Sequence, residues 1–152
     1  MTQCLLTSVT IFLILMSLNV IPNDVVVASI AATSFMVFAM PHRRITRVRY
    51  IVGGYVFGLV CGVVCHMLAH TEWIQSLVFL VLVKDNLFAA IAVGMAMFLM
   101  VLFNCEHSPA AAVSLGLVIN EWSIRTIVLT VLALFLILSY RFIFRNIMID
   151  LV

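Results

Sequence analysis

A carboxylate and an imidazole, Glu106 and His107, stand between two long apolar runs in the segment 104–112. Serine is favoured at a helix N-cap and proline in the first helical turn, so Ser108 and Pro109 predict that a helix begins here. The unpaired N–H groups and the positive dipole end of a helix start attract anions. The segment therefore indicates either a site for a small anion or a capped loop in which Glu106 and His107 are only solvated.

A second group of polar side chains lies in the apolar stretch 25–40, where Ser29, Thr33 and Ser34 could donate hydrogen bonds to the same anion. The alternative is that these hydroxyls bond to the backbone of their own helix, as serine and threonine commonly do in membrane helices. The predicted anion pathway consists of His107, Ser108, Pro109, Ala110, Thr33 and Ser34.

An ionised Glu106 facing the pathway would oppose the entry of an anion. We therefore expect its carboxylate to point away, toward Arg141 or Arg145 or toward His107.

Two cysteines and two histidines, Cys61, Cys65, His66 and His70, recur at four-residue spacing and include residue types that bind soft metals. The other reading is a pair of histidines near the membrane interface beside buried thiols, and no carboxylate is evident nearby. The sequence predicts no bound metal and no cofactor.

Composition places the whole chain in a membrane. Of its 152 residues, 66% are hydrophobic and 9% are charged, whereas soluble domains are roughly 45–50% apolar. The length allows about five to six transmembrane helices and no separate catalytic module, so an enzyme is the least expected function. The predicted fold is all-α, a compact bundle forming one transmembrane domain over residues 1–152.

Apolar segments separated by polar residues give the expected helices. They run over about 4–21, 25–40, 50–69, 73–83, 87–103, 109–120 and 126–144. Three of them, 25–40, 73–83 and 109–120, fall at or below the roughly 17 residues needed to cross the hydrocarbon, which favours tilt, re-entry or burial in protein. The first segment has no basic residue before it and no cleavage site of small residues after it, so we expect a retained span.

Short polar stretches mark the breaks between these helices. Pro22, Asn23 and Asp24 predict a tight turn. Asp85 or Asn86 is expected to cap the helix over 87–103, which leaves 73–83 as an interfacial or re-entrant helix.

Four of the eight basic residues, Arg43, Arg44, Arg47 and Arg49, fall in one short loop. Basic loops resist translocation, so this loop and the N-terminus are expected in the cytoplasm, with the protein in the cell (inner) membrane. If 109–120 crosses, Arg141 and Arg145 also lie inside, so the charge distribution favours six crossings.

Glycines at four-residue spacing, Gly54, Gly58 and Gly62, form a stripe that lets another helix approach closely. We expect this stripe to pack against a helix and to border the anion pathway. Because short helices leave irregular backbone at membrane depth, we also expect neighbouring copies to cover it in a homo-oligomer.

Three stretches of this sequence resemble the HPP family of small membrane proteins, which is named for a His-Pro-Pro motif at the start of a late helix. The motif stands here as His107-Ser108-Pro109 before three alanines, and the similarity extends to Ala32-Thr33-Ser34 through Pro41 and to Ile51-Val52-Gly53-Gly54. Order and spacing agree across about residues 28–118. The resemblance implies nitrite transport.

The leading hypothesis is a transporter or channel for a small inorganic anion, nitrite-like in class, with the lipid bilayer, the anion and further copies of the chain as partners and no nucleic acid. A structural or regulatory membrane subunit and a soft-metal permease are the alternatives.

Overall fold

The computed structural model describes residues 2–17, 24–76, 83–120, 123–145 and 148–151. These residues form helices and connecting turns without a β-strand, which confirms the predicted all-α class. The elements are α1 (Thr2–Ser17), α2 (Asp24–Ala39), the 3-10 turn η1 (Arg44–Thr46), α3 (Val48–Ala69), α4 (Glu72–Gln75), α6 (Lys84–Leu102), α7 (Ser108–Ile119) and α8 (Ile124–Phe144).

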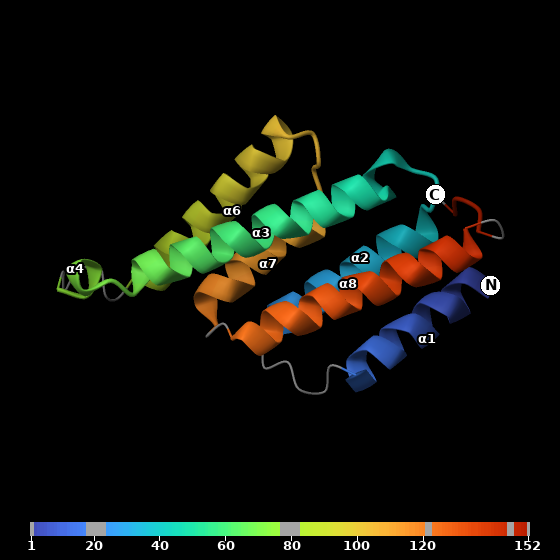
Figure 1. The fold of residues 1–152 in the computed structure, drawn as a ribbon, viewed down its shortest axis with the longest axis horizontal. Coiled ribbons are helices and arrows are strands. Elements are labelled where there is room, and N and C mark those ends of the chain that lie inside the picture. Colours follow the sequence, from blue (N-terminus) through green and yellow to red (C-terminus); the bar gives the residue numbers. More distant parts are fainter. Residues whose placement is uncertain (1, 18–23, 77–82, 121–122, 146–147, 152) are drawn as a thin grey trace.

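The short helix α7 lies at the centre of the bundle. It packs against α3, α6 and α2, while α2 also contacts α1 and α8 (Figure 1). Most of its inward residues are small or apolar and fully buried, including Ala110, Val113, Ser114 and Leu117. At 12 residues it is about 18 Å long, too short to cross about 30 Å of hydrocarbon.

Several hydrogen bonds show which helix ends lie together. The Gln3 side chain donates to the carbonyls of Phe38 and Ile149, at 3.0 and 2.7 Å, and Arg49 donates to the Phe103 carbonyl at 3.2 Å. The starts of α1 and α3 therefore share one end of the bundle with the ends of α2, α6 and α8 (Figure 1). We call it the arginine end, because it carries Arg43, Arg44, Arg47, Arg49, Arg141 and Arg145.

Three helices are long and apolar enough to cross a membrane, namely α3, α6 and α8. The helices α2 and α7 and the stretch Gln3–Ile14 of α1 are apolar but shorter. The protein is therefore a membrane-embedded bundle in which two of the long apolar helices, α3 and α6, pack against a shorter central helix.

Some helices begin at other residues than predicted, and with other caps. The prediction that Asp85 or Asn86 caps the helix over 87–103 is wrong, because α6 begins at Lys84 after Val83 without a side-chain cap. Ser123 does cap α8, accepting a hydrogen bond from the Thr126 N–H at 3.2 Å, and this bond moves the helix start to Ile124.

Two predicted connections lie partly outside the described residues. Residues 18–23, and with them most of the expected turn at Pro22, Asn23 and Asp24, are not described; Asp24 opens α2. Of the predicted helix 73–83, the structure describes the residues up to Ser76, which include most of the four-residue α4, and Val83, because 77–82 also fall outside.

Candidate functional site

The loop between α6 and α7 leads from the arginine end into the bundle. Arg44 donates to the Asn104 side chain at 2.6 Å, and the Tyr50 hydroxyl donates to the same oxygen at 3.2 Å. Asn104 has a φ of 52°, a left-handed conformation that asparagine tolerates better than most residues. This turn directs the chain inward, so that His107 is 1% exposed.

The three glycines of α3 face the start and middle of α7. A Cβ atom at Gly54 would lie 2.6 Å from the His107 Cβ, and one at Gly58 would lie 2.3 Å from the Ala110 carbonyl oxygen. At Gly62 the nearest atoms, in Ser114 and Leu117, would be 3.0 Å away. The two backbones are therefore in direct contact along this face, so the stripe packs closely against a helix, as expected, and that helix is α7.

A buried polar cluster surrounds the start of α7 and consists of Ser29 and Thr33 from α2, Tyr55 from α3 and His107. The Tyr55 hydroxyl lies 3.1 Å from the Ser29 hydroxyl and 2.8 Å from the Thr33 hydroxyl. Thr33 also lies 3.1 Å from His107 Nε2, and Ser29 donates to the Pro109 carbonyl. All four side chains are at most 2% exposed, so hydroxyl and imidazole groups from three segments meet inside the bundle.

His107 is a neutral member of this cluster. It lies in the loop before α7, and burial lowers the pKa of His107 to about 4, although the backbone carbonyl of Ile45 partly offsets this effect. Its Nδ1 is buried and completes no hydrogen bond of ordinary geometry with any described residue. At neutral pH the ring therefore has one N–H donor and one acceptor nitrogen rather than a positive charge.

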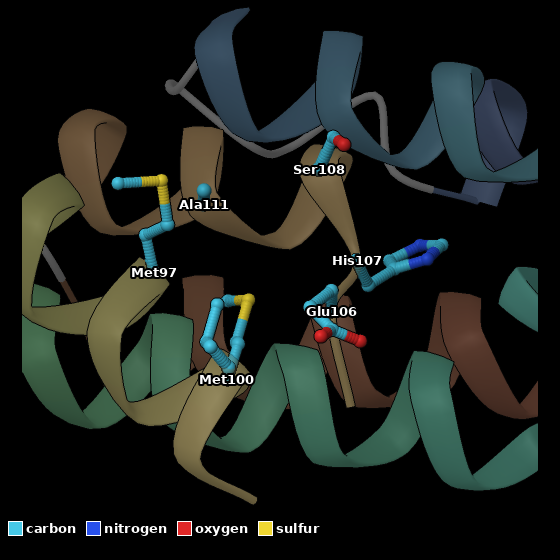
Figure 2. Close-up of a pocket in the computed structure, with 7 residues that line it drawn as sticks. Met97, Met100, Glu106, His107, Ser108 and Ala111 are labelled. Carbon is cyan, nitrogen blue, oxygen red and sulfur yellow. The ribbon is translucent and has the colours of Figure 1, made fainter. Parts of the chain in front are cut away.

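A groove of about 320 Å³, which we call the methionine groove, lies on the other side of the α6–α7 loop. Its lining is Met97, Met100, Val101, Glu106, His107, Ser108 and Ala111. Figure 2 shows the His107 ring directed away from Met97 and Met100. Glu106 is exposed, so the groove combines apolar walls with one carboxylate.

The expected partners of Glu106 do not engage it. No ion pair joins it to Arg141, Arg145 or His107 in the part of the chain that the structure describes, and Arg141 instead donates to the Pro41 carbonyl at 3.0 Å.

The remaining predicted pathway residues have different environments. Ser108 is exposed and is the first residue of α7, while His107 occupies the N-cap position, so the predicted serine cap is wrong. The turn is closed by the backbone, since the Ala110 N–H donates to the His107 carbonyl at 3.0 Å. Ser34 donates to the Ile30 carbonyl of its own helix at 3.0 Å, so the structure joins Thr33 but not Ser34 to His107.

The candidate metal ligands lie toward the other end of α3. Cys61 and Cys65 are buried, and the rings of His66 and His70 stack with centroids 4.2 Å apart. Among the described residues, no three His, Cys, Asp or Glu side chains gather as a metal site would require.

Sequence reasoning did not single out Tyr55, which contacts three members of the cluster. Its ring centroid is 5.8 Å from that of His107, and its hydroxyl meets both α2 hydroxyls. The available signal was a tyrosine beside Gly54 in the middle of an apolar span, because a phenol buried there needs a hydrogen-bond partner.

Comparison with family models gives one match, to HPP, transmembrane region, over residues 1–150. Comparison with curated proteins and with solved structures finds no match. The matched region contains every span and the whole buried polar cluster. The chain therefore belongs to the HPP family of transmembrane proteins.

Proposed function

We propose that this protein conducts a small inorganic anion, nitrite-like in class, across the membrane past the start of α7. The observation that carries the proposal is the buried polar cluster at that helix start. Hydroxyls of Thr33 and Tyr55 and the neutral ring of His107 offer hydrogen-bond donors inside an apolar bundle, next to the positive end of the α7 dipole.

Neutral hydrogen-bond donors favour passage of an anion over its tight binding. A full positive charge buried beside an anion would hold it strongly, whereas conduction requires binding weak enough for release. In the described helices, charged residues occupy only terminal turns, as with Asp24 in α2, Arg49 in α3 and Arg141 in α8. This distribution lacks the mid-span carboxylates of common proton relays and favours passive or weakly coupled movement.

Glu106 indicates which side of the α6–α7 loop the anion would use. An ionised carboxylate in the methionine groove repels an anion there, so the path runs on the opposite side, between α2 and α7. Because Thr33 is 0% exposed and His107 is 1% exposed, conduction requires these two helices to separate at the cluster.

The direct test is nitrite flux into proteoliposomes that contain only this chain. Wild-type protein is expected to give flux well above that of protein-free vesicles. His107→Ala removes a donor and is expected to reduce the flux by about tenfold, the value of one hydrogen bond of ordinary strength. Ser108→Ala removes the hydroxyl of the first residue of α7, and its flux tests whether that hydroxyl contributes to the pathway.

Thermal melting of each variant checks that it folds. Flux at the protein-free level for well-folded wild type, or unchanged flux in both folded variants, would exclude the anion pathway and favour the structural or regulatory role.

We also propose a homo-oligomer assembled through the outer face of α6. Ala90 and Gly94 are exposed there, and a Cβ at Gly94 would meet no atom within 4 Å. Small residues on an outer helix face permit close approach of a second copy. Gly94→Leu is expected to raise the ratio of monomer to oligomer severalfold. Light scattering in mild detergent measures this ratio. A wild-type protein that is monomeric in several mild detergents and still conducts would refute the proposal.

We propose that the protein lies in the cell (inner) membrane with its arginine end facing the cytoplasm. Six arginines at this end, against Lys84 and Arg125 elsewhere, give the asymmetry that the positive-inside rule describes. Arg43→Cys in a cysteine-free background is expected to react with a permeant thiol reagent in intact cells and not with an impermeant one. Labelling by the impermeant reagent would reverse the orientation.

A further inference from the structure

Three arginines meet where α8 ends. Arg141 lies in the last turn of α8, Arg145 follows that helix, and Arg47 immediately precedes α3. Arg141 is within electrostatic range of both Arg47 and Arg145, so two positive charges act on it. Like charges repel, so a negatively charged partner would stabilise the three arginines in this arrangement.

The hydrogen bonds of Arg141 are incomplete. One terminal nitrogen donates to the Pro41 carbonyl at 3.0 Å, which fixes the guanidinium against the start of the η1 loop. Its Nε is buried and has no acceptor among the described residues. A buried N–H without an acceptor is unfavourable, and an oxyanion beside the guanidinium would satisfy it.

The carboxylates of the arginine end are placed elsewhere. Asp150 accepts from the His42 N–H at 3.0 Å and lies 3.6 Å from the His42 ring. Glu106 lines the methionine groove beside α6 and α7. No salt bridge to Arg47, Arg141 or Arg145 occurs within the ranges that the structure describes, so those ranges provide the three arginines with no negative partner.

We propose that Arg47, Arg141 and Arg145 form a binding site for a phosphate group. Guanidinium forks match phosphate oxygens in geometry and bind them with paired, charge-assisted hydrogen bonds. Basic pockets between helices at the cytoplasmic membrane face bind the head groups of anionic lipids. The phosphate comes from an anionic phospholipid or from solution, and the site is independent of the proposed anion pathway.

The competing explanation is local. Arginines in the last turn of a helix interact favourably with its C-terminal dipole and need no ligand for this effect. That explanation predicts a contribution to stability that is the same with or without phosphate.

The test measures binding of phosphatidylglycerol to the purified full chain by native mass spectrometry, with phosphatidylcholine as the zwitterionic comparison. Removing two exposed charges in the double variant Arg47→Gln, Arg145→Gln is expected to weaken phosphatidylglycerol binding by about thirtyfold. Arg141→Lys keeps the charge but removes Nε, and is expected to weaken binding as well. Arg125→Gln, at the opposite end of α8, is the matched control and should bind as the wild type does.

A second arm adds inorganic phosphate and follows the melting temperature of each protein. A rise in wild type that is lost in the double variant, without preference for phosphatidylglycerol, supports the site with phosphate from solution as its ligand. Equal phosphatidylglycerol binding and equal response to phosphate in wild type, the double variant and Arg125→Gln would overturn the proposal, whereas loss of nitrite flux alone would not affect it.

Discussion

Gly58→Ala is expected to lower the melting temperature of the protein by about 10 °C in detergent. The added methyl group would lie 2.3 Å from the Ala110 carbonyl oxygen and 3.1 Å from the carbonyl carbon. Both atoms belong to the backbone of α7 rather than to a flexible side chain, so the helices must move apart. Overpacking in a core costs about 1–3 kcal/mol, and a contact with backbone falls at the upper end of that range.

Gly94→Ala is the matched control for this substitution. It adds the same methyl group to an apolar helix, but the new Cβ would meet no atom within 4 Å, and alanine is the better helix former. Alanine is also small enough for a second copy to approach closely at this face. We therefore expect a melting temperature equal to or slightly above that of wild type. If Gly58→Ala and Gly94→Ala melted alike, α7 would not lie against the glycine face of α3.

This pair of glycines also shows what the sequence could predict about packing. Four-residue spacing along α3 predicted a close helix contact, because one helix face is defined by local geometry alone. The partner helix was not predictable, since the contact between Gly58 and Ala110 joins segments about fifty residues apart. Spacing within one helix shows which residues share a face, but it cannot show which distant segment packs there.

Helix existence followed from hydropathy, whereas helix starts depended on a choice among neighbouring residues. Ser108, Asp85 and Asn86 are all favoured cap types, yet the caps are His107 and Val83. Propensity differs little between adjacent positions, and at α7 the backbone bond from Ala110 to His107 closes the turn without any side chain. Only Ser123 combined a suitable type with a capping bond.

The buried polar cluster was predictable in part. His107 and Thr33 were selected because imidazole and hydroxyl groups are uncommon in apolar segments, and the structure places them 3.1 Å apart. Ser34 carries the same chemistry but faces its own backbone, a difference of one position on a helix that changes direction by about 100° per residue. The hydroxyl of Tyr55 meets both α2 hydroxyls and its ring packs beside that of His107, and only the fold brings it there.

Thr33→Val is expected to reduce nitrite flux by about tenfold, if the anion passes the buried polar cluster. It is also expected to lower the free energy of unfolding by about 1–3 kcal/mol, because the buried His107 Nε2 loses its partner. Valine keeps the shape of threonine but lacks the hydroxyl that lies 2.8 Å from Tyr55 and 3.1 Å from His107 Nε2. Tyr55→Phe removes the other end of the same contact and is expected to have a similar effect. Flux into proteoliposomes is measured at equal protein density.

Thr130→Val controls for the loss of a buried hydroxyl as such. Thr130 is 0% exposed, and its hydroxyl donates at 2.7 Å to the Thr126 carbonyl within α8 rather than to a member of the cluster. Its replacement removes the same group from another membrane helix and should leave flux at the wild-type level. The double variant Thr33→Val, Tyr55→Phe should lose little more than either single variant, because both substitutions break one shared contact. Equal flux in Thr33→Val, Thr130→Val and wild type would mean that the cluster only holds α2, α3 and α7 together, and the anion would have to cross elsewhere.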